Sequence, residues 1–334
     1  MSGKNTNTYQ RSFLNESIMT NFQMSNDSDV QNRASNFEFF SSSVCIALLT
    51  SLGSEAVAIV TLNILAIIVF LKERRLRKRS MYLTISLAVA DMFNAWPVIL
   101  WIFSLGKECN IWTINLVFNP TKIAIAVALN FYFKALSIIN LTAISLERMH
   151  ATFRPFTHRL VKKKVFGAAV VAVWFTAGLF TVIILLWIRF DVNAGLGAYF
   201  LFLLCCPFII LVSYASIGIK FYCGTHPQHH GAISRERKLT KTLFIVTVVS
   251  LSLLLPALIA LFFGHVSSWK SFEAISHQTM WLLKYSLYSL ICANSFVNPL
   301  LYSFKMPEFK RALLLLLCCR FRSEPVQVFP LNDL

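Results

Sequence analysis

The chain has 334 residues, of which 56% are hydrophobic and only 14% are charged. Soluble domains contain about 45–50% apolar and about 25% charged residues, so this composition excludes an ordinary soluble protein. The net charge of +16 would suit a nucleic-acid partner. However, the basic residues lie between apolar runs rather than in one patch, so we expect a protein embedded in the lipid bilayer and no nucleic-acid partner.

The first 43 residues are rich in Asn, Ser and Thr and have few apolar side chains, so residues 1–43 are predicted to be a disordered tail. Asn15 and Asn26 stand in Asn-x-Ser sequons and are candidate glycosylation sites. The first apolar run begins near Val44, too far into the chain for an ordinary signal peptide. This run is therefore expected to be a first membrane-spanning helix.

Seven segments are apolar over the roughly 20 residues that a helix needs to cross the hydrocarbon layer. Polar or basic stretches separate them all. The chain is thus predicted to be an all-α membrane protein, with a seven-transmembrane helix bundle over residues 44–304. The seven segments are 45–71, 80–104, 119–147, 165–188, 197–222, 240–264 and 279–304.

The distribution of basic residues predicts the orientation of the bundle. Most of the 31 Lys and Arg residues lie in alternate connections, within 72–79, 148–164, 220–241 and 305–322. Positively charged connections stay in the cytoplasm, so the amino-terminal tail is expected to be extracellular. An odd number of spans then places the carboxyl terminus inside, as in a multi-pass protein of the plasma membrane.

A short amphipathic helix is expected over residues 305–319, after the last span. Pro307 suits the first turn of a helix, and the apolar side chains that follow can share a face on the inner leaflet. Cys318 and Cys319 are candidate palmitoylation sites, with free thiols as the alternative. Residues 320–334 are expected to form a cytoplasmic tail.

Several polar side chains fall inside the apolar segments, where an ionisable group is costly and usually functional. Asp91 lies in the second segment, and Lys134 lies in the third. An isolated Asn or Ser often only bridges two helices, but a carboxylate needs a cation, a proton or several donors. The other members of this set are Asn63, Asn130, Ser137, Asn294, Ser295 and Asn298.

The motifs around these residues resemble those of rhodopsin-like (class A) G-protein-coupled receptors. The most specific is the run from Asn294 to Tyr302, which contains Asn298-Pro299-Leu-Leu-Tyr302. Glu147-Arg148-Met149 stands where the family has Asp-Arg-Tyr. Further matches are Leu87-Ala-Val-Ala-Asp91, Pro155-Phe156, Trp174, Pro207 and Pro256, so that the resemblance covers about residues 45–320.

The resemblance implies a receptor that converts binding of an extracellular ligand into activation of a heterotrimeric G protein, by an outward swing of the sixth helix. It implies that Arg148 is a latch, paired with Glu147 and with Glu236 on the sixth helix. It implies that Phe156, held by Pro155, inserts into the G protein. The resemblance also assigns a switch in the seventh helix to Asn298, Pro299 and Tyr302.

The same resemblance implies an internal sodium site at Asp91, the one ion we expect, with no other cofactor. Its ligands would come from Asp91, Ser137, Asn294, Ser295 and Asn298. Lys134, one helical turn from Ser137 on the same face, offers an alternative, because its ammonium could neutralise Asp91 instead. The sequence leaves both arrangements open.

Some positions depart from the family pattern. Ser250 and Leu254 replace the usual Phe and Trp of the sixth helix. Ile123 replaces the cysteine that normally bonds to the second outer loop, and Cys45–Cys109 is a candidate substitute bridge. The missing bridge and the short loop near 189–197 loosely resemble the melanocortin, adenosine and lipid-receptor branch.

Two ligand classes are disfavoured, because the pocket positions lack the residues that would bind them. Asn130 stands where amine receptors have an aspartate, and Cys292 stands where opsins have the retinal-binding lysine. Lys134 could hold an anionic group of a ligand, and Leu254 would line the same pocket.

Two other functions remain as alternatives, a transporter or channel-like multi-pass protein and a receptor-like protein that does not couple to G proteins. A transporter would show repeats, broken helices and a polar path across the membrane, whereas no repeat is visible between the two halves and the polar cluster does not continue outward. No metal-ligand spacing or nucleophile–base pair is visible, so an enzyme is not expected.

Overall fold

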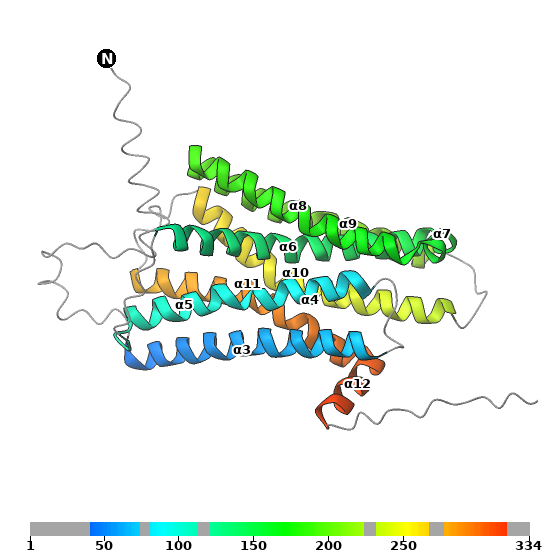
Figure 1. The fold of residues 1–334 in the computed structure, drawn as a ribbon. Coiled ribbons are helices and arrows are strands. Elements are labelled where there is room, and N and C mark those ends of the chain that lie inside the picture. The colour runs from blue at the N-terminus through cyan, green and yellow to red at the C-terminus, as the bar shows by residue number, and fades with distance from the viewer. Residues whose placement is uncertain (1–40, 74–80, 113–119, 224–231, 267–276, 319–334) are drawn as a thin grey trace, which may run out of the picture.

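The computed structural model describes residues 41–73, 81–112, 120–223, 232–266 and 277–318. The described residues are helical almost throughout, and the long helices run side by side as one bundle (Figure 1). This confirms the prediction of an all-α protein. The helices are α3 (Ser42–Lys72), α4 (Met81–Phe93), α5 (Ala95–Glu108), α6 (Pro120–Phe153), α7 (Pro155–Leu160), α8 (Lys163–Phe190), α9 (Val192–Cys223), α10 (Ala232–Val266), α11 (His277–Lys305) and α12 (Pro307–Leu317).

Within the described part of the chain, the structure has six helical segments long and apolar enough to cross a membrane. They are α3, α4 together with α5, and α6, α8, α9 and α10 over most of their lengths. The chain is therefore a multi-pass membrane protein. Helix α11 occupies the place of the expected seventh segment and packs along α10 and α3, but it is not among these six.

The second predicted segment, 80–104, is not one continuous helix. It breaks at Asn94, between α4 and α5, where the Asn94 amide donates to the Asp91 carbonyl at 3.0 Å. Pro97 lies just beyond the break. Because proline has no amide hydrogen and its ring clashes with the preceding turn, it accounts for the interruption.

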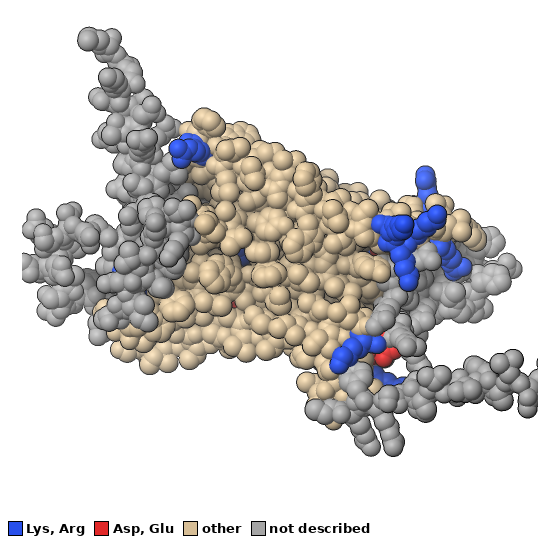
Figure 2. Space-filling model, viewed as in Figure 1, with Lys and Arg blue, Asp and Glu red and all other residues tan. Residues whose placement is uncertain are grey.

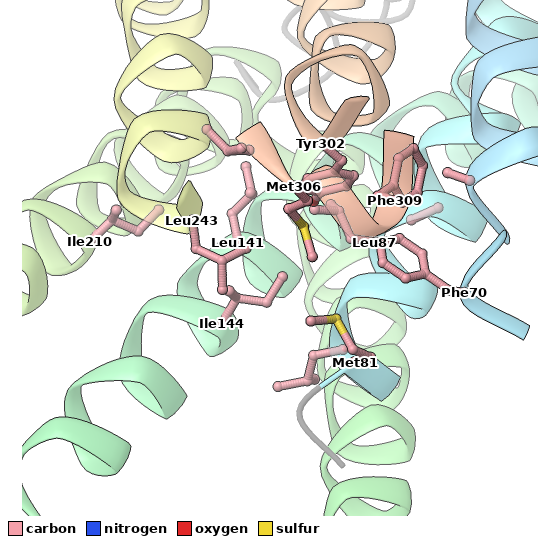
Figure 3. Packing of buried hydrophobic residues seen from close by; sticks show 14 of the residues in the cluster. Phe70, Met81, Leu87, Leu141, Ile144, Ile210, Leu243, Tyr302, Met306 and Phe309 are labelled. Atoms are coloured by element: carbon pink, nitrogen blue, oxygen red, sulfur yellow. The ribbon is translucent and has the colours of Figure 1, made fainter. Parts of the chain in front are cut away.

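An apolar cluster holds the helices together near α12. Tyr302 of α11 and Met306, which lies between α11 and α12, are beside Phe309 of α12, and Phe70 of α3 packs against this group (Figure 3). The Phe70 and Phe309 ring centroids are 5.2 Å apart. Lipid tails are as apolar as these side chains, so close van der Waals packing is what favours the cluster in a membrane.

The two ends of the bundle differ in chemistry. At one end, a disulfide joins Cys45 of α3 to Cys109 after α5, with a Cα–Cα distance of 6.0 Å, which confirms the substitute bridge. The opposite end carries α7 and α12, and most of the Lys and Arg surface on the face that Figure 2 shows gathers there, with a smaller basic area at the disulfide end (Figures 1 and 2). This charge asymmetry agrees with the sequence pattern.

Helix α12 lies within residues 305–319, where the sequence predicts an amphipathic helix, and has Pro307 in its first turn. The Cys318 side chain is exposed just after α12. The glycosylation candidates Asn15 and Asn26 and the second palmitoylation candidate, Cys319, lie outside the described residues.

Candidate functional site

Asp91 lies at the centre of the bundle and is completely buried. The Ser137 hydroxyl of α6 donates to Asp91 Oδ1 at 2.6 Å, and the Asn298 amide of α11 donates to Asp91 Oδ2 at 2.9 Å. Three helices therefore meet at one carboxylate. The structure brings together these three residues of the predicted ion site.

A wider ring of polar contacts surrounds this carboxylate. Asn94 donates through its amide to the Ser295 hydroxyl at 3.2 Å, and Asn63 donates to the Ser295 carbonyl at 2.9 Å. The Ser250 hydroxyl donates to Asn298 Oδ1 at 2.9 Å and so connects α10 to the ring. Asn94 and this bond of Ser250 were not foreseen, because both depend on how distant segments pack.

The donor atoms of this centre fit a small hard cation. Asp91 supplies a carboxylate, and Ser137 supplies a hydroxyl oxygen beside it. The side-chain oxygens of Asn94 and Asn294 are buried and have no hydrogen-bond partner among the residues that the structure describes. Because buried polar atoms normally have partners, two unpaired oxygens in this region suit an oxygen-liganded ion such as sodium.

A cavity of about 230 Å³ opens above the polar centre. Asn130, Lys134 and Leu254, three of the four predicted pocket residues, line it. The fourth, Cys292, is fully buried and contacts the Lys134 ammonium instead. The floor of the cavity includes Ser137 and the polar residues Asn94, Asn294 and Ser295.

The remaining walls of the cavity are mainly aromatic and aliphatic side chains. Tyr199 and Phe131 pack edge to face with ring centroids 4.6 Å apart, and Leu203 and Leu258 complete the side formed by α9 and α10. Such a concave, largely apolar site with a few polar groups is typical of small-molecule binding sites.

Lys134 points away from the polar centre. Its ammonium lies 3.8 Å from Cys292 Sγ and 4.8 Å from the centroid of the Tyr288 ring. The buried carboxylate of Glu55 interacts with it electrostatically and accepts a 2.8 Å hydrogen bond from Ser289. The sequence left open whether Lys134 neutralises Asp91. This geometry favours the arrangement in which Lys134 does not pair with Asp91.

At the other end of the bundle, Arg148 is buried and pairs with its neighbour Glu147 through two charge-assisted hydrogen bonds. His158 of α7 also contacts Glu147, with 2.7 Å between Nε2 and Oε1. The predicted pair with Glu147 is therefore present. Glu236 belongs to α10, but its side chain lies outside the described residues.

Pro155 and Phe156 begin α7, and the Phe156 side chain is 81% exposed. The Lys220 ammonium of α9 donates to the Thr152 carbonyl at 2.9 Å and holds α9 against the end of α6, beside α7. The structure thus places Phe156 on the surface at the same end of the bundle as Arg148.

The predicted residues of the seventh-helix switch occupy the last half of α11. Pro299 lies inside the helix, and Tyr302 is buried against Phe70 and Phe309. Between α9 and α10, the Thr247 hydroxyl of α10 donates to the Tyr214 hydroxyl of α9 at 3.3 Å. Helix α10 is therefore held to its neighbours by hydrogen bonds as well as by apolar packing.

The family model of the 7 transmembrane receptor (rhodopsin family) matches residues 62–302. The chain is 27% identical over 274 residues to melanocortin receptor 5 of Pan troglodytes, a match that covers 77% of this chain and 80% of that receptor. It is 32% identical over 124 residues to the D(3) dopamine receptor of Mus musculus, covering 37% of this chain and 25% of that receptor. It is also 30% identical over 118 residues to octopamine receptor beta-2R of Drosophila melanogaster, covering 35% of this chain and 21% of that receptor.

The chain therefore matches about a quarter or less of the length of the dopamine and octopamine receptors. The family model, by contrast, matches well over half of the chain and includes most of the polar centre, the cavity and the buried arginine. This chain belongs to the rhodopsin family of seven-transmembrane receptors, and is a G-protein-coupled receptor by membership.

Proposed function

We propose that this receptor converts the binding of an extracellular ligand into activation of a heterotrimeric G protein, by an outward swing of α10. The observation that carries the proposal is Arg148, a fully charged side chain that is 1% exposed and paired with Glu147. Burying an arginine is costly unless it is paired. In a second, open state the Arg148–Glu147 pair would separate, and the Arg148 side chain could then contact the G protein.

The orientation follows from the two ends of the bundle. The end with α7 and α12 carries the basic side chains and is the cytoplasmic end in this proposal (Figure 2). The end with the Cys45–Cys109 disulfide then faces the oxidising exterior. Helix α11 supplies the seventh span, and the amino-terminal tail lies outside a plasma membrane.

The kinked helices make the motion of α10 feasible. Pro207, Pro256 and Pro299 lie inside α9, α10 and α11, where each removes one backbone hydrogen bond. A ligand in the cavity shifts the receptor towards the open state only if it binds that state more tightly. Leu254 and Leu258 line the cavity on α10 close to Pro256, so contacts there differ between the two positions of the helix.

We also place a sodium site at the polar centre of the closed state. Asp91 would supply the negative charge, and Ser137, Asn94 and Asn294 would supply neutral oxygens. Bound sodium would satisfy the two unpaired amide oxygens and compensate the buried carboxylate. Any motion that separates α11 from α4 would remove some of these ligands, so the ion is expected to favour the closed state.

The proposal is tested by nucleotide exchange on purified Gα subunits of each class, with the receptor in lipid vesicles and no ligand. Replacing Glu147 with Gln weakens the Arg148 pair, which is worth about 1.5–3 kcal/mol for bonds to a charged group, and should raise basal exchange about tenfold or more. Arg148→Gln should abolish exchange. Arg154→Gln, a change of an exposed arginine at the same end, is the matched control and should leave exchange unchanged.

If neither the natural chain nor Glu147→Gln stimulates any Gα subunit, coupling is refuted and a non-coupling receptor is favoured. If Arg154→Gln lowers exchange as much as Arg148→Gln, then general positive charge, and not the buried latch, is responsible.

A further inference from the structure

The Lys134 ammonium is a positive charge on the wall of the ligand cavity. It carries three hydrogen-bond donors, whereas its nearest described contacts are the Cys292 sulfur at 3.8 Å and the face of Tyr288. A thiol is a weak acceptor, and an aromatic face accepts only a diffuse attraction. The contacts in the structure therefore leave donor capacity for a bound molecule.

Within the described part of the chain, Lys134 forms no ion pair with a carboxylate. Both Asp91 oxygens accept hydrogen bonds from Ser137 and Asn298. Glu55 attracts the ammonium from beyond ion-pair distance. One of its carboxylate oxygens accepts from Ser289, and the other is buried without a hydrogen-bond partner among the described residues. The Lys134 ammonium on the cavity wall would therefore form its strongest hydrogen bonds with an anionic group of a bound ligand.

A second polar group in the cavity, the side-chain oxygen of Asn130, could accept a hydrogen bond from a ligand. The side-chain oxygen of Asn130, one turn from Lys134 on α6, is buried and has no hydrogen-bond partner in the described ranges of the chain. Because an unpaired buried acceptor costs about 1–3 kcal/mol, a ligand with an N–H or O–H group would recover that loss. The walls between these two polar points are apolar, with Phe131, Ile138 and Leu203 among them.

We propose that the cavity binds a small monocarboxylate with an apolar, preferably aromatic, body and one hydrogen-bond donor. The carboxylate pairs with Lys134, the donor bonds to the Asn130 oxygen, and the body fills the aromatic walls. The cavity of about 230 Å³ is smaller than the usual range for drug-sized ligands, which limits the body to about one ring. A cationic amine would be repelled by Lys134. This inference rests on the proposed receptor function.

The test uses matched pairs of probes that differ only in charge, namely phenylpropionate, hydroxyphenylpropionate and hexanoate with their primary amides. Binding is measured as the rise in thermal unfolding midpoint of the purified receptor, with no G protein present. Carboxylates should raise the midpoint more than their amides, and hydroxyphenylpropionate should be the best of the three. Lys134→Gln should weaken carboxylate binding about 10- to 100-fold, the usual range for a hydrogen-bonded charge.

Lys107→Gln is the matched control, because Lys107 is exposed at the end of α5 and does not line the cavity. Lys134→Arg keeps the charge and should retain the preference for carboxylates, which covers the case that Lys134→Gln fails to fold. Equal effects of amides and carboxylates, an unchanged affinity in Lys134→Gln, or no shift with any probe would each overturn the inference. Carboxylate binding without exchange on any Gα subunit would support it and refute the proposed coupling, so the two failures are distinguishable.

Discussion

Replacing Ser250 with alanine is expected to raise the basal activity of the receptor. The Ser250 hydroxyl donates to Asn298 Oδ1 at 2.9 Å, and both residues are buried at 1% exposure or less. Alanine fills nearly the same volume, so the main loss is one hydrogen bond. The Asn298 oxygen then remains buried without this donor, which costs about 1–3 kcal/mol.

The cost falls on the closed state, because the bond joins α10 to α11 and would break when α10 swings outward. Since 1.4 kcal/mol is a factor of ten, the ratio of open to closed receptor should rise by about 5- to 100-fold. Ligand-free nucleotide exchange, normalised to the amount of folded receptor, measures this ratio. Ser252→Ala is the control, because the exposed Ser252 hydroxyl donates to the Val248 carbonyl of its own helix and connects no two helices among the described residues.

The reasoning is refuted if Ser250→Ala has the same basal exchange as Ser252→Ala, or less, at equal amounts of folded protein. It would then follow that the bond either persists during activation or is replaced by water at no cost.

Two further predictions concern the ends of the bundle. Cys109→Ser should lower the thermal midpoint, since the bridge closes a loop with a sequence separation of 64 residues and is worth at most about 4 kcal/mol by the chain-entropy model. A reductant should lower the midpoint of the natural chain but not of this variant, and mass mapping that finds both thiols free would contradict the bridge. His158→Ala should speed amide hydrogen exchange in α7 several-fold, about the effect of one lost hydrogen bond, because His158 attaches α7 to Glu147. Leu160→Ala, an exposed change on the same helix, should not, and equal exchange in the two variants would show that His158 does not hold α7 in place.

The polar centre could be predicted because its cause is local. A carboxylate such as Asp91 inside an apolar segment is costly, so its presence alone marks a site. The resemblance to the receptor family then indicated which distant residues surround it, and the structure places Ser137 and Asn298 on its two oxygens. The buried pair of Glu147 and Arg148 was predictable for the same reason, since the two are neighbours in sequence.

Other features depend on packing between distant segments and left little trace in the sequence. The buried position of Glu55 was not predicted, because a single carboxylate barely lowers the mean hydropathy of a helix as apolar as α3. Its partner Ser289 is 234 residues away, and no local pattern connects the two. Helix α7 has six residues, too few to show a helical periodicity. The break before Pro97 could have been found from the proline itself.

Helix ends were also misplaced for a physical reason. Helix α6 continues to Phe153 and α10 begins at Ala232, both beyond the apolar segments predicted for them. Hydropathy reports where side chains meet lipid, whereas a helix ends where its backbone hydrogen bonds end. Basic and polar residues extend a helix beyond the hydrocarbon layer at little cost, since most of them are good helix formers.

The ligand cavity and the polar centre around Asp91 share residues, and this bears on the two positions of α10, Ser250 and Leu254, that depart from the family pattern. Ser137 lines the cavity and also donates to Asp91, so a ligand that moves α6 changes a bond of the polar centre directly. From Asp91 the contacts continue through Asn298 to the Ser250 hydroxyl on α10. A receptor with Phe and Trp in α10 would transmit the motion by aromatic packing, whereas Ser250 and Leu254 offer neither ring. Hydrogen bonds are shorter in range and more directional than apolar contacts. We therefore expect activation of this receptor to depend on the polar chain more than on the size of the side chain at Leu254.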